Sequence, residues 1–343
     1  MLIEGFSTPE KRTNRLILEA NTKYWDKSRM PRIKRIVFDN TIAQQDAVER
    51  VKTKEGRIDL VTELSPLETL TVAQSQFAKV VKRRDSPSVV IGHFNMRKDG
   101  SPLVDVRVRK AINFAINRPD LIRYAAKGNG VVIPALIPAN DFGYDPDLAP
   151  YPFDPGKARD LLREAGYPSG RPVVLIAPPT LEAESTVVSK MLEQVGLNVD
   201  RQIVDAEAFN RRTFVSPQGQ PAEQTWDIAL GLYYDVITFP VTELYKYSAL
   251  GGPYDWIGET PELQRLAAQV AGTVDREKQR KLIQQMERVT HEQAYFLFLY
   301  TPIKLYAVNK AVEFVPHQNG QLILHETSVT GQHWSVRKTG TKR

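Results

Sequence analysis

Alternating apolar and polar residues, the pattern of half-buried β-strands, characterise the first ninety residues of the chain. Residues 15–20 and 33–38 alternate most clearly, and shorter apolar runs follow at 58–61, 80–81 and 89–94. Two segments between these runs, 44–54 and 66–75, instead place apolar residues at helical spacing, and Gly56 follows the first as a suitable stop. The pattern predicts short strands interrupted by two helices.

Helical spacing dominates the middle of the chain. Apolar residues from 104 to 116 fall on one face of a 3.6-residue repeat, with Asp105 near the start. A second helix is expected from Pro119, because proline suits the first turn of a helix, and a third from Asp154 and Pro155, which supply an N-cap and a proline at the first position.

From residue 173 onward, strand and helix patterns alternate. The expected elements are a strand at 173–177, a helix at 183–195, a strand at 197–204, a helix at 207–214, a strand at 228–232, two helices within 260–293, and strands at 296–299 and 304–308. Alternation of this kind indicates an α/β fold in which helices pack against a sheet.

Composition places the chain among soluble globular proteins. It has 343 residues, 42% hydrophobic and 25% charged, which is enough for about two domains. The longest apolar run, residues 295–300, is far shorter than the ~20 residues that span a bilayer. The sequence has no cysteine, which excludes disulfides, thiolate metal sites and cysteine nucleophiles.

The net charge of +6 has an uneven distribution. Residues 1–100 hold 19 Lys and Arg against 13 Asp and Glu, whereas the remainder holds 27 of each. No recognisable nucleic-acid-binding module accompanies the excess, so we interpret it as a solvated surface and expect no nucleic-acid partner.

The first ten residues, MLIEGFSTPE, lack the basic start and the apolar stretch of a secretory signal peptide. If Met1 is the true start, the sequence therefore predicts a cytoplasmic protein.

Several motifs resemble one family. FNMRKDGSPLVDVRVRKAINFAINRPDLI (residues 94–122) is similar to the family 5 solute-binding proteins of ABC importers, which bind dipeptides, oligopeptides or nickel. Four further stretches resemble the same family in the same order: RLILEANTKYWDK (15–27), IPANDFGYDPDLAPYPFDPGKARDLLREAGYPSG (137–170), TWDIALGLYYD (225–235) and YFLFLYTPIKLYAVNKAVEFVP (295–316).

The resemblance implies a two-lobed α/β periplasmic-binding-protein fold of type II. It also implies that the family's N-terminal region is missing, so that the first lobe is incomplete. Residues 1–92 and 300–343 are expected to form part of the first lobe, and residues 93–299 the second. The hinge would then lie near residues 92–95 and 298–301.

The resemblance also suggests which residues bind the solute. In peptide-binding members an aspartate after the strand that corresponds to residues 227–232 takes the α-ammonium of the ligand, and a carboxylate makes a charge-assisted hydrogen bond with such a cation. Asp235 is the candidate, but it lies one position early and Val236 occupies the expected place. Because one position reverses a side chain's direction in a strand, either a bulge restores Asp235 to the cleft or the ammonium ligand is absent.

Four more residues are candidates for the cleft. Tyr233 lies where the family commonly has tryptophan, and either it or Tyr234 is expected to form a cleft wall; the alternative is ordinary core and surface tyrosines. Trp256 could stack over a ligand side chain or pack its loop onto the lobe. Asn95, after the first hinge strand, could bond to backbone across the cleft.

Metal and enzyme sites receive little support. His317, His325 and His333 recur every eight residues, a spacing that separates neighbours by about 26 Å in a strand and about 12 Å in a helix unless a turn intervenes. The run HEQAY (291–295) lacks the second histidine of a zinc-protease motif, and no phosphate loop or nucleophile elbow occurs. We therefore expect no cofactor, no metal and no catalytic residue.

The sequence thus predicts the solute-binding component of an ABC importer, which would capture a peptide-like solute between two lobes and deliver it to permease subunits. The resemblance implies a periplasmic or cell-envelope location. The alternative is a truncated fragment that does not transport, or an intracellular sensing or interaction domain on the same fold.

Overall fold

The computed structural model of the chain describes residues 2–4, 13–84, 86–139, 141–214, 225–234, 245, 250–317 and 322–336. The chain divides into two compact units. Unit 1 comprises Met1–Arg83 and Lys304–Arg343, and unit 2 comprises Arg84–Ile303. The boundaries that we expected at residues 92 and 299 lie inside two paired strands of unit 2. None of the helices in the described ranges is long and apolar enough to cross a membrane.

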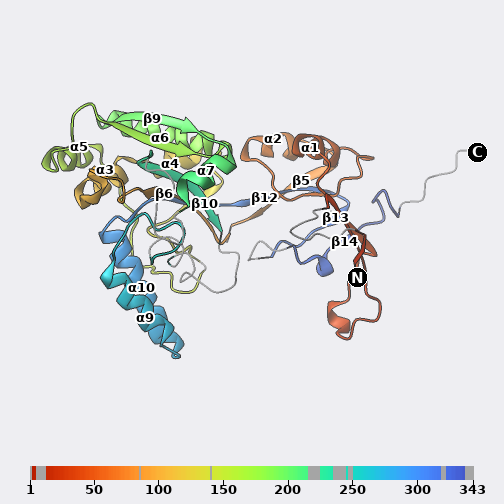
Figure 1. The fold of residues 1–343 in the computed structure, drawn as a ribbon. Helices are drawn as coiled ribbons and strands as arrows, with labels where there is room; N and C mark the ends of the chain where they lie inside the picture. Colours follow the sequence, from red (N-terminus) through yellow and green to blue (C-terminus); the bar gives the residue numbers. More distant parts are fainter. Residues whose placement is uncertain are drawn as a thin grey trace, which may run out of the picture. The chain divides into compact units, whose positions relative to one another are not determined.

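A six-stranded mixed sheet, with the strand order β7-β11-β6-β10-β8-β9, forms the centre of unit 2 (Figure 1). The strands are β6 (Ser88–Phe94), β7 (Gly130–Val132), β8 (Pro172–Ala177), β9 (Asn198–Ile203), β10 (Ile228–Tyr234) and β11 (Phe296–Pro302). β6 pairs antiparallel with β10 and β11, while β8 runs parallel to both β9 and β10. Because β6 and β11 come from opposite ends of this unit's sequence, their pairing closes the unit.

The helices of unit 2 begin at the caps that the sequence predicts. Asp105 Oδ1 accepts a hydrogen bond from Arg107 N, and Asp154 Oδ1 accepts one from Lys157 N, both at 2.8 Å. The helices are η3 (Pro102–Val104), α3 (Val106–Ala115), α4 (Arg118–Tyr124), α5 (Pro155–Glu164), η4 (Pro179–Leu181), α6 (Glu182–Gln194), α7 (Ala206–Thr213), α9 (Pro261–Ala271) and α10 (Arg276–Glu292). Figure 1 shows α9 and α10 as a helical pair that projects from this unit.

Both faces of the sheet are covered near β8. Successive side chains of a strand point to opposite faces, and those of β8 enter two different core clusters. Val173, Leu175 and Ala177 belong to the main core cluster, to which α6 contributes Val188 and Leu192. The alternate β8 residues, Val174 and Ile176, face the other side of the sheet. There Ile176 belongs to a second cluster with Phe209, Trp226, Ala229 and Trp256, and Val174 packs against it. A strand that is apolar on both sides is typical of a buried sheet interior.

Two buried arginines bind backbone carbonyl groups instead of carboxylates. Arg118 is 2% exposed, and its guanidinium donates to the carbonyl oxygens of Asn113, Ile116, Tyr151 and Phe298 and to Asn113 Oδ1. Arg109 is 3% exposed and donates to the carbonyl oxygens of Leu103, Val104, Gln293 and Ala294. Burial lowers the pKa of each to about 10, so both stay charged at neutral pH. They connect the α3 region to the chain around β11.

Unit 1 contains smaller sheets. Their strands are β1 (Leu2–Glu4), β2 (Arg15–Glu19) and β3 (Arg35–Asp39) in one sheet, β4 (Leu60–Val61), β5 (Ala78–Arg83) and β12 (Lys304–Asn309) in the next, and β13 (Val312–Glu313) with β14 (Ser328–Val329). The helices are η1 (Lys27–Arg29), α1 (Gln44–Val51), η2 (Pro66–Glu68), α2 (Thr69–Ala73) and η5 (Leu324–Glu326). β12 lies between β4 and β5, so the C-terminal part of the chain completes a sheet begun by the N-terminal part.

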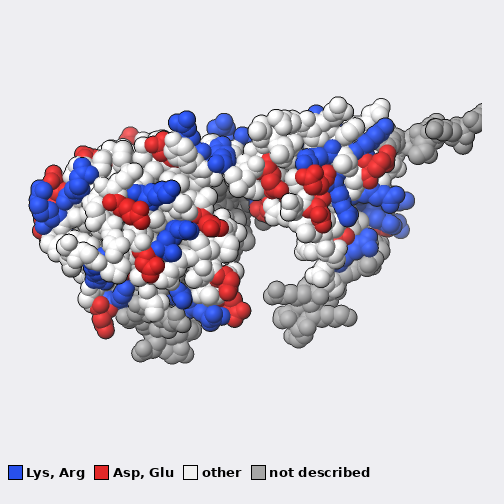
Figure 2. Space-filling view, turned by 90° about the horizontal axis from the view of Figure 1, so that it is seen from above, with Lys and Arg blue, Asp and Glu red and all other residues white. Residues whose placement is uncertain are grey.

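Positive and negative side chains are interspersed on the face of the molecule shown in Figure 2. Many of the exposed pairs are short-range, such as Arg163 with Asp160 and Arg211 with Glu207, three and four residues apart. This mixed distribution agrees with the interpretation of most of the charge as solvated surface.

Candidate functional site

The register of β6 against β10 brings a histidine and a tyrosine to the same face of the sheet. His93 pairs with Ala229, and Val89 pairs with Tyr233, four positions further along the ladder. Residues that pair directly across an antiparallel ladder point to the same face, and so do residues two apart in one strand. The side chains of His93 and Tyr233 therefore share a face, although 140 residues separate them in sequence.

Tyr233 lies along its own strand and covers Gly231. A Cβ added to Gly231 would lie 2.4 Å from Tyr233 Cε2, so only glycine leaves room for the ring. The ring faces His93, with centroids 4.8 Å apart, and is 6.1 Å from the ring of Tyr254. Phe296 packs edge-on against the other side of His93 at 5.2 Å. These four rings form an aromatic group that lies along β10, from His93 opposite Ala229 to Tyr233 at the end of the strand.

Burial keeps the polar members of this group uncharged. His93 is 2% exposed, and burial lowers its pKa to about 3, so the imidazole is neutral at physiological pH. Burial likewise raises the pKa of Tyr233 above its ordinary value. The group therefore carries no charge of its own.

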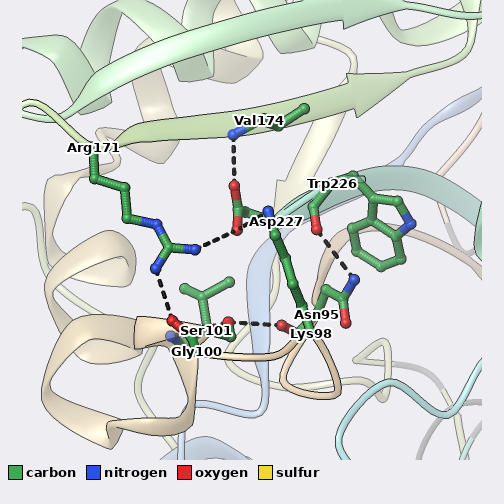
Figure 3. A network of polar contacts seen from close by, with 9 residues as sticks. Asn95, Lys98, Gly100, Ser101, Arg171, Val174, Trp226 and Asp227 are labelled. Carbon is green, nitrogen blue, oxygen red and sulfur yellow. Dashed lines mark hydrogen bonds and ion pairs between the residues drawn. The ribbon is translucent and has the colours of Figure 1, made fainter. Parts of the chain in front are cut away.

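A buried carboxylate ties together three segments at the opposite end of β10 (Figure 3). Asp227 is 3% exposed; its Oδ2 accepts from Val174 N at 2.9 Å, and its Oδ1 accepts from Lys98 Nζ at 2.9 Å and from Arg171 at 3.3 Å. Arg171 also donates to the carbonyl oxygen of Gly100 at 2.8 Å. Asp227 thus fixes the start of β8, the start of β10 and the loop after β6.

Asn95 belongs to the same network (Figure 3). It is 0% exposed; its Nδ2 donates to the carbonyl oxygen of Trp226 at 3.1 Å, and its backbone N donates to that of Asp227 at 2.9 Å. Ser101 Oγ donates to the Asn95 carbonyl oxygen at 2.8 Å. The side-chain oxygen of Asn95, Oδ1, has no hydrogen-bond partner in the described part of the chain. The structure gives Asn95 a loop-anchoring position, and a direct contact with solute stays a prediction.

Trp256 packs against Trp226, as the packing alternative in the sequence analysis described. The two rings are T-shaped with centroids 4.7 Å apart, and Trp256 is 1% exposed. Its indole Nε1 donates to the carbonyl oxygen of Thr213 at 2.8 Å, while its carbonyl oxygen accepts from Met96 N at 3.0 Å. Stacking of this ring on a solute would require the indole to leave Thr213 and Trp226, and that role stays a prediction.

One loop joins the aromatic group to the Asp227 network. Tyr254 faces Tyr233, and Trp256, two residues later, packs beside Trp226. Asp255 between them is 2% exposed; it accepts hydrogen bonds from the backbone N of Gly251, Ile257 and Gly258 and lies 3.4 Å from Arg97. The carboxylate of Asp255 therefore fixes the shape of the loop.

The remaining candidates fall outside what the structure describes. β10 ends at Tyr234, for which only the backbone is described. Asp235 lies outside the residues that the structure describes. Among the predicted site residues with described side chains, Tyr233 precedes Asp235 most closely in the sequence. His93 and Tyr254 lie beside its ring. The sequence suggests that His93, just before Asn95, either approaches the cleft or packs at the hinge, with packing favoured, and it does not indicate Tyr254. The paired register of β6 and β10 identifies His93, but that register is invisible in the sequence.

The three C-terminal histidines do not gather. His317 and His325 lie with ring centroids 6.5 Å apart on either side of Glu326, whereas His333 Nε2 donates to Asp59 Oδ1 at 2.8 Å. Within the described ranges, no group of three or more His, Asp or Glu side chains could hold a metal ion.

Replacing Gly231 with alanine should displace the Tyr233 ring from His93. The added Cβ would overlap the ring, so the side chain must rotate away, and overpacking of this kind costs about 1–3 kcal/mol of unfolding free energy. Thermal unfolding of Gly231→Ala, with and without Tyr233→Ala, measures the effect. In the Tyr233→Ala background the same substitution should cost much less, and an equal cost in both backgrounds would contradict the assignment.

Sequence comparison matches residues 8–253, more than half of the chain, to the family described as bacterial extracellular solute-binding proteins, family 5 middle. The dipeptide-binding protein of Escherichia coli K12 is 28% identical over 185 residues, which is 54% of this chain and 33% of that protein. The glutathione-binding protein of Shigella flexneri is 33% identical over 163 residues, 45% of this chain and 30% of that protein. The matched part therefore spans about a third of each relative.

Solved structures share the fold at low sequence identity. A periplasmic binding protein of Helicobacter pylori in complex with the peptide STSA superposes with a TM-score of 0.77 at 20% identity, covering 95% of this chain and 62% of that one. A substrate-binding protein of an ABC transporter from Listeria monocytogenes gives a TM-score of 0.82 at 16% identity, covering 96% and 66%. The α/β, two-lobed periplasmic-binding-protein class expected from the sequence is thereby confirmed, and this chain spans about two thirds of those structures.

Proposed function

This chain belongs to the bacterial extracellular solute-binding proteins of family 5, and from that premise we propose that it binds a short peptide and delivers it to the permease of an ABC importer. The observation that carries the proposal is the similarity to a dipeptide-binding and a glutathione-binding protein at 28% and 33% identity. Both named solutes are short peptides with an ammonium group, a carboxylate and side chains. The proposed location is the periplasm or cell envelope.

The aromatic group along β10 supports a peptide solute. Sites for small molecules are largely apolar and aromatic, with a few placed polar groups. Tyr233 and Tyr254 offer ring surface for a peptide side chain, and neutral His93 adds no charge that would repel the ammonium group. The carboxylate of Asp235, which follows the strand that carries Tyr233, is proposed to take that ammonium group.

Isothermal titration calorimetry with dipeptides, glutathione and Ni²⁺ tests this function. We expect a short peptide to bind and its N-acetylated form, which lacks the ammonium charge, to lose most of that affinity. Asp235→Ala should abolish binding of the free peptide. Asp147→Ala, an exposed aspartate in the same unit, is the matched control and should bind normally.

Two outcomes would contradict different parts of the proposal. Equal affinity of Asp235→Ala and the parent chain would remove the role of Asp235 but leave the solute class intact. Binding of Ni²⁺ with no response to any peptide would reject the peptide class itself.

A further inference from the structure

The connection between β2 and β3 concentrates positive charge. Residues 20–34 contain Lys23, Lys27, Arg29, Arg32 and Lys34 against one acid, Asp26, so this short segment carries +4 of a chain whose net charge is +6. Figure 1 shows the connection, which includes η1, extending as a loop beyond the two strands that it joins. The loop therefore carries a large part of the charge excess found in the first third of the sequence.

The positive charges of this loop form no salt bridge within the described part of unit 1. All five cations are exposed, and their side chains make no ion pair with the described residues. The single acid is already engaged, because Asp26 Oδ1 caps η1 by accepting from Ser28 N at 2.9 Å and from Ser28 Oγ at 2.6 Å. Arg35, just after the loop, pairs with Glu19. The charge of the loop is thus available to an external partner.

An aromatic side chain projects from the same loop. Trp25 is 80% exposed, whereas Trp226 and Trp256 are 0% and 1% exposed. The only described neighbour of its ring among aromatic residues is Tyr24, at 5.7 Å. A tryptophan in this setting contributes nothing to a core, and its indole is suited to the interface between water and lipid, where tryptophan is enriched in membrane proteins.

A pocket of about 280 Å³ opens at the base of the loop. Arg29 and Lys34 contribute positive charge to its lining, against one acid, Glu19, which pairs with Arg35, and His325 lines it from the C-terminal part of the chain. Leu18, Ile33 and Ile36 supply apolar surface. This combination suits a group that has an anionic head next to an apolar portion.

We propose that the β2–β3 connection, residues 20–34, docks onto an anionic phospholipid surface, with Trp25 at the water–lipid interface and the five cations over the head groups. This contact is separate from solute capture. Each Lys or Arg near an anionic membrane contributes about 1 kcal/mol, so five of them with one inserted indole give a reversible attachment and no permanent anchor. The exposed indole and the apolar pocket lining favour lipid over nucleic acid, which would use the charge alone or a row of stacking rings.

Vesicle sedimentation with the full chain tests the proposal. We expect binding to vesicles of phosphatidylcholine with 30% phosphatidylglycerol and none to pure phosphatidylcholine, with the binding lost in 0.5 M NaCl, where charges are strongly screened. Trp25 emission should shift to the blue on binding, and Trp25→Phe should remove that shift. The triple variant K23Q/K27Q/R32Q should bind about 100-fold more weakly, from the loss of three contributions of about 1 kcal/mol each.

The matched control is R265Q/K278Q/K281Q, which removes three exposed cations from α9 and α10 and the same net charge. It should sediment with vesicles like the parent chain. Equal weakening of both triple variants would show that only net charge matters and would overturn the proposal. Failure of the parent chain to bind vesicles, tighter binding to a single-stranded oligonucleotide, or displacement by inorganic phosphate beyond a chloride control of equal ionic strength would overturn it too.

Discussion

Replacing Arg118 with methionine is expected to lower the unfolding free energy of unit 2 by about 3–5 kcal/mol, because several buried acceptors lose a charged donor at about 1–3 kcal/mol each. The five acceptors of the guanidinium come from the end of α3, the chain at Tyr151 and β11. Methionine fills similar volume but donates nothing, so each of these acceptors loses one donor. Asn113 Oδ1 keeps a second donor, Phe298 N, and an acceptor left unsatisfied costs about 1–3 kcal/mol. Domains are typically stable by only 5–15 kcal/mol.

Urea unfolding followed by tryptophan fluorescence measures this loss in unit 2, because Trp226 and Trp256 are buried there. Arg163→Met on α5 is the control, since the Arg163 side chain is 75% exposed and a surface substitution changes stability by less than about 0.5 kcal/mol. Arg118→Lys should fall between them, because an ammonium group cannot reproduce the planar set of donors. If Arg118→Met matches Arg163→Met, the network does not stabilise the unit.

The second large effect is a loss of stability as the pH rises, caused by Glu287 on α10. Glu287 is 1% exposed; its carboxyl group accepts from Tyr245 Oη at 2.6 Å, Ile137 N at 2.8 Å and Leu136 N at 3.3 Å. No cation contacts it among the described residues, and burial raises its pKa to about 7. Asp145, which Arg288 contacts at 2.6 Å, adds a smaller effect in the same direction.

A raised pKa of a carboxyl group means that the folded state holds its proton more tightly than the unfolded chain. The contribution of Glu287 is therefore fully present below about pH 4.5, the unfolded value, and is lost between that pH and the folded value of about 7. The total is on the order of 3 kcal/mol, because each pKa unit corresponds to about 1.4 kcal/mol. Tyr245 stays protonated throughout, since burial and Glu287 hold its pKa well above the ordinary value.

Unfolding measured from pH 4.5 to pH 8 checks this expectation against Glu287→Gln, whose amide does not titrate. The parent chain should lose stability relative to the variant as the pH increases. Glu193→Gln, an exposed glutamate on α6, should run parallel to the parent chain at every pH. A constant difference between Glu287→Gln and the parent chain across the range would exclude the titration of Glu287 as the cause.

Local sequence signals predicted most of the individual elements. Asp105 and Asp154 cap the helices that they were expected to start, α6 matches its predicted segment, 183–195, to within one residue at each end, and α10 lies within the predicted segment 260–293. These signals succeed because helix caps and amphipathic repeats act over a few residues. The alternation of strand and helix patterns also indicated the α/β class, and the motifs carried the resemblance to the family.

The candidate site was harder to predict, since the strands that build it pair over long sequence distances. Asn95 and Trp256 were selected from the sequence as cleft residues, and the structure gives both buried positions with backbone partners. Neither the burial of Asp227 between Lys98 and Arg171 nor the position of His93 opposite Tyr233 has a local signal. Both depend on the register between β6, β8 and β10.

The sequence by itself determined the helices and strands, the family, the absence of cysteine chemistry and the excess of charge in the first third of the chain. Only the tertiary structure decided which buried charges are satisfied, which rings meet along β10, and that Trp25 and five cations are exposed together on one loop. The reason is that hydrogen-bond partners and burial depend on contacts between segments more than a hundred residues apart, whereas helical periodicity and capping are properties of neighbouring residues.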